Sequence, residues 1–220
     1  LVLDRRPAMM LYDERWPWIS KPAAVRESVA AVVASAIAAR ADLAELDFAG
    51  GEAHWAPPAR GGRQPVVERR LDSAEPAPED TLERSLAFLD GHRGDLPGGS
   101  FVFVFSDFLA APRPEAWLRA GDRGWDVVPV VIRDPTWELG FPEVHGVAIP
   151  LSDPASGEVS VVRLTRREVE ARRRANADRA DRLGRELAAC GARPVLITSD
   201  DPYEIDRTFL AWAEERRRLR

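Results

Sequence analysis

The stretch that most constrains the fold is GGSFVFVFSDF (98–108), which contains an unbroken run of apolar residues. Successive side chains of a β-strand point to opposite faces of a sheet, so a strand that is apolar at every position needs cover on both faces. The run therefore predicts the central strand of a sheet with helices on both sides. This strand ends in a carboxylate, Asp107.

Strands and helices alternate along almost the whole chain. Besides the central strand, we expect strands at 1–4, 41–50, 125–134 and 193–200. Apolar residues at helical spacing predict helices over about 23–40, 80–90, 112–121, 167–191 and 201–220. This alternation predicts an α/β fold, with a doubly wound, mostly parallel sheet covered by helices on both faces. We expect residues 1–220 to form a single domain.

Four segments depart from simple alternation. EAHWAPP (52–58) is a candidate hairpin partner for the strand at 41–50, and 145–164 is expected to form a hairpin that turns around DPASGE. Residues 57–79 read as a loop with one short strand candidate, PVVERRL. Pro129 lies inside the strand at 125–134 and favours a place near the sheet edge, or a bulge.

Composition excludes several classes of protein. The net charge of -5 argues against a nucleic-acid-binding surface. The chain has 1 cysteine, Cys190, so it forms neither an internal disulfide nor a cysteine zinc site, and a reducing compartment is the default. No signal peptide and no membrane-spanning apolar run is visible. The chain starts without Met inside an expected strand, so we expect the C-terminal part of a longer protein.

Two expected strands end in an acid, LVLD at Asp4 and FVFVFSD at Asp107. In doubly wound sheets, ligands bind at the carboxyl ends of the strands, where the strand order reverses. If these strands are neighbours, both acids point into one crevice, where they could hold Mg²⁺ together with a hydroxyl and water. The alternative is that each acid only caps the loop or helix that follows it.

Several stretches together resemble a known family. They are LVLDRRPAMM, EDTLERSLAFL, FVFVFSDF, VVPVVIRDPTWELGFP with LSDPASGE, and GARPVLITSDD. In this order and spacing they resemble a von Willebrand factor A-like domain. More closely, they resemble the bacterial "domain of unknown function 58" proteins that are associated with MoxR-type AAA+ ATPases. The resemblance implies a cytoplasmic domain, in many relatives one of a membrane-anchored protein.

The resemblance also implies a metal-ion-dependent adhesion site, with the pattern Asp-x-Ser-x-Ser after the first strand. By position, Asp4 and Asp107 keep its acids, and Thr81 is its threonine, with Asp80 as the alternative if the register shifts by one. Arg6 and Ala8 stand where the serines belong. Alanine offers no ligand and arginine brings a fixed positive charge, so we expect a degenerate site.

We hypothesise that an arginine takes the place of the metal. The guanidinium of Arg6, or that of Arg5, would neutralise both acids through charge-assisted hydrogen bonds. The protein then needs no cofactor, and the alternative is that Mg²⁺ still binds.

Aromatic residues follow several of the expected strands, at the same sheet edge as the acids. With Arg6, they are candidates for contact with a protein partner: Trp16, Trp18, Phe108 and Trp137. The alternative is that they form a largely buried roof over the crevice.

Two functions of different class follow. The first is a non-enzymatic protein-interaction domain that works with a MoxR-type AAA+ ATPase in an assembly or chaperone-like system. The second is a metal-dependent phosphohydrolase or nuclease that uses the strand-end acids Asp4, Asp107, Asp134 and Asp200. Arg6 counts against the enzyme, because a cation in the metal position repels a divalent ion.

Overall fold

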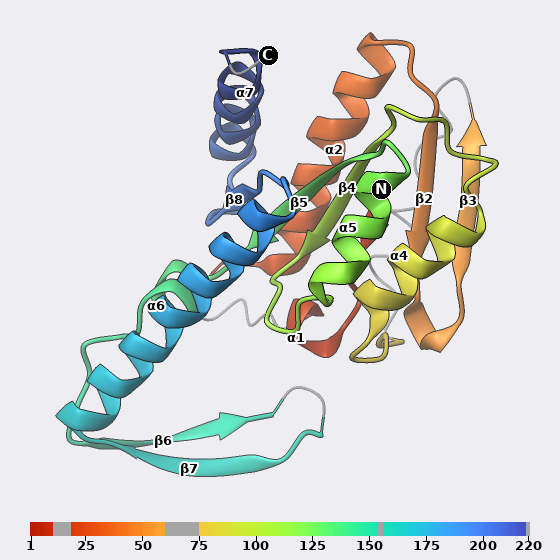
Figure 1. Ribbon diagram of the computed structural model, residues 1–220. Helices are drawn as coiled ribbons and strands as arrows, with labels where there is room; N and C mark the ends of the chain where they lie inside the picture. The colour runs from red at the N-terminus through yellow and green to blue at the C-terminus, as the bar shows by residue number, and fades with distance from the viewer. Residues whose placement is uncertain (11–18, 60–74, 154–155, 219–220) are drawn as a thin grey trace.

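A six-stranded sheet with the order β3-β2-β1-β4-β5-β8 forms the centre of the computed structural model, which describes residues 1–10, 19–59, 75–153 and 156–218 (Figure 1). The strands are β1 (Val2–Leu3), β2 (Leu43–Asp47), β3 (His54–Ala59), β4 (Phe101–Ser106), β5 (Asp126–Ile132) and β8 (Val195–Ile197). All neighbours are parallel except β2 and β3, which are antiparallel and are joined through η1 (Ala49–Gly51). The strand order reverses between β1 and β4, which places a switch point between the two strands that end in acids.

Helices cover both faces of the sheet, which confirms the predicted fold class. On one face lie α2 (Lys21–Ala38) and α7 (Pro202–Arg218), and on the other lie α4 (Thr81–Gly91), α5 (Pro114–Asp122) and part of α6 (Arg166–Ala189). The strand β4 shows why its sequence is apolar throughout: Val104 packs with one helical layer and Phe105 with the other. Both side chains are buried.

The helix α2 begins at Lys21, two residues before the predicted start at 23. The hydroxyl of Ser20 accepts a hydrogen bond from the backbone N–H of Ala23 at 3.2 Å, which caps the first turn. Pro22 is compatible with this turn because a first-turn N–H has no partner inside the helix. The helix start is therefore fixed by a cap that lies beside the carboxyl ends of the strands.

The position of Pro129 differs from expectation. Its strand, β5, lies between β4 and β8 and pairs with β4 in an unbroken register, so it is neither the edge strand nor bulged there. The pairing with β8 begins only at Val130, opposite Val195. The N–H of Arg133 donates toward β8, and two-residue alternation turns the nitrogen of Pro129 to the same side, before the ladder starts. The proline therefore costs no sheet hydrogen bond.

The hairpin predicted at 145–164 is present as a separate two-stranded sheet, β6 (Val147–Ser152) and β7 (Val159–Leu164). It extends away from the central sheet beside the start of α6, and we call it the arm (Figure 1). Its base packs through Leu164 against Phe141 and Val169. Asn176 of α6 donates to the carbonyls of Trp137 and Gly140 at 2.8 and 2.5 Å.

These two bonds fasten the turn η2 (Pro135–Leu139), which follows β5, to the long helix α6. The helix α1 (Pro7–Met10) follows β1 directly. Among the described residues, no helix is both long and apolar enough to cross a bilayer. The strand candidate PVVERRL and the two tryptophans Trp16 and Trp18 lie outside the described residues.

Candidate functional site

The strands that end in Asp4 and Asp107 are neighbours, which meets the condition under which both acids were expected to share one site. Val2 and Leu3 pair with Val104 and Phe105, and the N–H of Asp4 continues the ladder to the carbonyl of Phe105 at 3.0 Å. Asp4 and Asp107 therefore leave neighbouring strands at the switch point. Their exposed fractions are 3% and 0%, so both carboxylates depend on partners inside the protein.

The guanidinium of Arg6 lies between these acids. Its Nε donates to both oxygens of Asp4 at 3.0 Å, and its Nη2 donates to Asp4 Oδ2 at 2.5 Å and to Asp107 Oδ1 at 3.3 Å. Nη2 also lies 3.2 Å from the hydroxyl of Ser106, which itself donates to Asp4 Oδ2 at 2.6 Å. The hypothesis that an arginine joins both acids is thus confirmed for Arg6.

The surroundings of Arg6 keep it charged. Burial alone would lower its pKa, but hydrogen bonding to Asp4 and the charges of Asp4, Asp107 and Glu79 outweigh burial and raise the pKa. Glu79 Oε2 lies 3.8 Å from Nη1 of Arg6, and its side chain is 70% exposed. A charged arginine therefore lies between the two strand-end acids.

A second buried cation, Lys21, completes the neutralisation of Asp107. Its Nζ donates to Asp107 Oδ2 at 2.9 Å and to Glu138 Oε1 at 2.5 Å. Lys21 occupies the first turn of α2, where the helix dipole disfavours a cation, so its position depends on the two carboxylates. Burial would lower the pKa of Lys21, but the charges of Asp107 and Glu138 and hydrogen bonds to both raise it.

Charges inside the cluster balance. Asp4, Asp107 and Glu138 face Arg6, Lys21 and Arg133, and we call these six residues the charge cluster. Arg133 is 1% exposed, and its Nε donates to the backbone carbonyl of Asp107 at 2.9 Å. Burial lowers the pKa of Arg133. The three acids of this cluster are thus matched by three bases, and burial makes each of these charges depend on its partners.

The carboxylate oxygens of Asp4 and Asp107 already accept hydrogen bonds from groups of the chain itself. Each oxygen of Asp4 and of Asp107 accepts a hydrogen bond from a cation, a hydroxyl or a backbone N–H of the chain. Among the described residues, no group of three or more acidic, histidine or cysteine side chains is arranged to hold a metal ion. With Arg6 and Lys21 in these positions, the residues present do not fit a divalent cation.

The predicted third ligand, Thr81, is the first residue of α4 and is fully buried. Its Oγ1 makes no hydrogen bond within the described part of the chain. The segment before α4 is held against the loop after β1, because the N–H of Ala77 donates to the carbonyl of Arg5 at 2.9 Å. The alternative, Asp80, points outward and pairs with Arg84 at 2.8 Å, so Thr81 is the residue that faces the interior.

The expected contact residues need correction. Arg6 is 3% exposed and Phe108 is 2% exposed, so neither side chain is available to a partner in this conformation. Phe108 has a left-handed backbone with φ of 51°, which is strained for a bulky residue, and its ring packs against Trp117. Trp137 is half-buried and packs edge-to-face on Phe141 at the base of the arm. The positions of Phe108 and Trp137 therefore favour a largely buried roof over the crevice, and they do not favour direct contact with a partner.

The two remaining strand-end acids serve as backbone caps. Asp134 accepts hydrogen bonds from the N–H groups of Thr136 and Trp137, both at 2.8 Å, and from Ile19 at 3.2 Å. Asp200 accepts from the N–H of Ser20 at 3.0 Å. Both acids therefore fasten the segment before α2 to the sheet, and neither joins the charge cluster.

Sequence reasoning missed three members of the charge cluster: Lys21, Arg133 and Glu138. A signal was present for Lys21, because it is the only lysine among 31 basic residues and stands at the start of an apolar helix. No local pattern marks Glu138, whose contact with Lys21 spans 117 positions of sequence. Ser106 was not among the predicted site residues, although its hydroxyl donates to Asp4 and accepts from the N–H of Phe108.

A comparison with protein-family models found a match for the chain. The model described as "Protein of unknown function DUF58" matches residues 19–183. The chain belongs to this family. The matched range includes Lys21, Thr81 and Asp107, whereas Asp4 and Arg6 precede it.

Solved structures similar to this DUF58 protein include a conserved hypothetical protein, BatB, from Bacteroides thetaiotaomicron. It is 14% identical, with 97% of each chain covered and a TM-score of 0.44. Another is an uncharacterized membrane-spanning protein from Vibrio fischeri, 17% identical, with 96% of each chain covered and a TM-score of 0.23. No curated protein matches the chain.

We predict that Lys21→Met destabilises the protein strongly. Removing one member of a buried ion pair leaves the other charges uncompensated, and the expected loss is about 3–5 kcal/mol of unfolding free energy. Urea unfolding followed by tryptophan fluorescence measures it. The control is Arg167→Met, which also removes a cation from a first helical turn but at an exposed position. Equal losses in the two variants would contradict a structural role for the charge cluster.

The effect of Lys21→Met should also depend on pH. The pKa of Lys21 is raised in the folded protein. Its stabilising contribution is therefore complete below the pKa of an unfolded lysine, and it is lost as pH rises through the higher folded value. The stability difference between wild type and Lys21→Met should stay constant from neutral pH to about pH 10 and shrink above it. A difference that grows between neutral pH and about pH 10 would show that the pKa is lowered instead, because the unfolded state would then bind more protons over that range.

Proposed function

We propose that this DUF58 protein is a non-enzymatic protein-interaction domain of the von Willebrand factor A-like type, with a degenerate metal-ion-dependent adhesion site. One observation supports the proposal: the guanidinium of Arg6 donates to both Asp4 and Asp107, the two acids that the family resemblance assigns to the metal. The buried hydroxyl of Thr81, which has no hydrogen bond within the described residues, supports it, because this is the residue type that the pattern requires.

A charged arginine changes how such a site could work. In metal-bearing relatives of this fold, an acid of the partner completes the shell of the ion. Here the cation is almost fully buried and both acids are neutralised, so no open coordination position remains. The charge cluster then holds the loops that follow β1 and β4, and the surrounding exposed rim makes the contact. Leu109 is 38% exposed and lies two residues beyond Asp107 on this rim.

The proposed partner is a MoxR-type AAA+ ATPase, in an assembly or chaperone-like system. This part of the proposal rests on the family resemblance.

The enzyme alternative, a metal-dependent phosphohydrolase or nuclease, is weaker for a chemical reason. Asp134 and Asp200 are occupied by backbone N–H groups, and Asp4 and Asp107 by cations, so none of these acids offers a free pair of oxygens for metal.

We predict that divalent ions leave the thermal stability of the wild-type protein unchanged. A ligand that binds only the folded state raises the unfolding midpoint, so Mg²⁺ or Mn²⁺ measured against EDTA reports directly on binding. Restoring the serines with Arg6→Ser and Ala8→Ser, alone and together with Lys21→Met, should create a rise in the midpoint with Mn²⁺. A metal-dependent rise in wild type that disappears in Asp107→Ala would contradict the degenerate site and favour the enzyme.

We predict that the rim around the charge cluster binds the MoxR-type ATPase encoded in the same genome. Isothermal titration calorimetry with the ATPase in the presence of ATP should show saturable binding, weakened about tenfold or more by Leu109→Glu, because a charge is forced into the contact. The matched control is Leu210→Glu, on α7, where the leucine is 64% exposed. No binding by wild type, or equal loss in both variants, would refute the proposed partner or the proposed surface respectively.

A further inference from the structure

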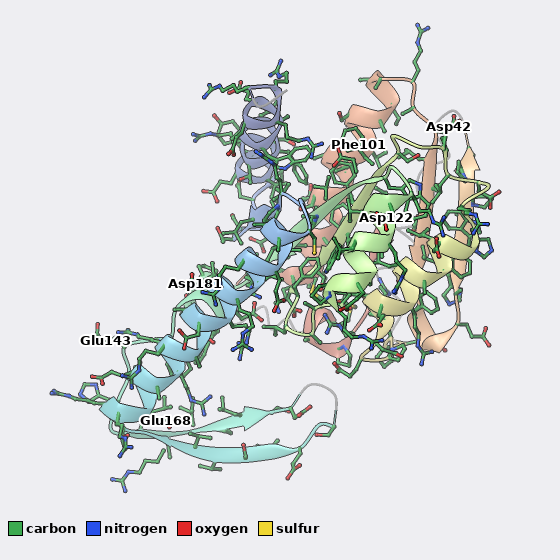
Figure 2. All side chains as sticks on the ribbon, viewed as in Figure 1. Asp42, Phe101, Asp122, Glu143, Glu168 and Asp181 are labelled. Atoms are coloured by element: carbon green, nitrogen blue, oxygen red, sulfur yellow. The ribbon has the colours of Figure 1, made fainter. Side chains whose placement is uncertain are left out.

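The arm presents backbone groups that no described element uses. The strands β6 and β7 pair only with each other among the described strands, and Glu143 and Glu168 mark their junction with the body in Figure 2, well apart from Phe101 and Asp42. A two-stranded ribbon has two open edges, and its N–H and C=O groups there can pair with another strand. The arm therefore carries open backbone edges that belong to a different sheet from the charge cluster.

Register decides which groups face outward on β7. The carbonyls of Glu158 and Leu164 accept hydrogen bonds from Asp153 and Gly146, on the side of β6. Alternation along a strand then turns the N–H and C=O groups of Val159 and Val161 to the opposite, outer edge. At the end of this edge, the carbonyl of Arg163 accepts from the N–H of Thr165 at 3.1 Å, which closes the edge at residue 163.

The two edges of the arm differ in chemistry. The outer edge of β6 contains Pro150, which has no N–H and interrupts any added ladder. The outer edge of β7 contains no proline, lysine or acid between Val159 and Val162. Natural sheets protect an edge with proline or charged residues or cover it, and the only such residue on β7 is Arg163, near its end.

The exposed side chains of β7 also favour the addition of another strand at its outer edge. Val159 and Val161 are 61% and 73% exposed and lie on one face of the ribbon. Arg163 is exposed on that face, beside them, and makes no ion pair with a described residue. An added strand that alternates apolar residues with polar ones, and places an acid opposite Arg163, would cover the valines and neutralise the arginine.

We propose that the outer edge of β7 is a docking site for an extended segment of a partner protein, which adds to the arm as a third strand. The segment reads acid-x-apolar-x-apolar in the antiparallel direction, with the acid opposite Arg163 and the apolar residues opposite Val161 and Val159. Main-chain hydrogen bonds supply affinity, and the alternating side chains supply selectivity. This site does not rest on the function proposed above, because it lies on a different sheet and uses none of the charge cluster.

Fluorescence anisotropy with a labelled peptide of sequence SETVTVS tests the proposal on the full 220-residue chain. We expect saturable binding, about tenfold weaker in Val161→Pro, which removes an outward N–H without removing a bond to β6. The matched control is Ala148→Pro, which places a proline on the outer edge of β6 and should leave binding unchanged. The charge-reversed peptide SRTVTVS should bind weakly to wild type and regain affinity in Arg163→Glu, a variant that keeps the strand intact if Val161→Pro does not fold.

Three outcomes would overturn the proposal. The first is no saturable binding of SETVTVS at millimolar concentration. The second is equal binding by wild type and a folded Val161→Pro, checked by near-ultraviolet circular dichroism. The third is a wild-type dimer in analytical ultracentrifugation that Val161→Pro abolishes, because the edge would then be covered by a second copy of the chain.

Discussion

Two ionised carboxylates at the ends of adjacent strands are costly to bury together unless a cation lies between them. This constraint organises the carboxyl edge of the sheet. Arg6 and Lys21 approach from opposite sides, one from the loop after β1 and one from the start of α2, and they meet at Asp107. The loop after β5 joins through Glu138. Three segments that are distant in sequence are thus held at one point by charge balance.

The same contacts connect the central sheet to the arm. Glu138 belongs to η2, whose other side is fastened to α6 by Asn176. Asp134 and Asp200 fix the segment before α2 to the ends of β5 and β8. The carboxyl edge is therefore a continuous hydrogen-bonded layer, and the arm is attached to it through η2 and α6. Any surface that a partner meets on this edge is backed by buried charge, with few apolar side chains in the layer itself.

Much of this arrangement could be predicted from sequence, for identifiable physical reasons. The apolar run of β4 fixed the need for two helical layers, and acids after two strands located the site. Arg6 was predictable because only two positions separate it from Asp4. Lys21 and Glu138 were not predictable, because the contacts of Lys21 with Asp107 and with Glu138 span 86 and 117 positions. Phe108 turned inward because of a left-handed backbone that no local pattern announces.

The bonds of Arg6 to Asp4 and Asp107 have a thermodynamic consequence. A metal ion that joins two acids is a separate molecule, so its occupancy follows its free concentration. The guanidinium is covalently part of the chain, so folding brings it to the acids and it cannot dissociate into solution. The contribution of Arg6 to the order of the loops after β1 and β4 is therefore independent of ion supply. The positive charge between Asp4 and Asp107 is thus present wherever the chain is folded, because the pKa of Arg6 is raised at this site.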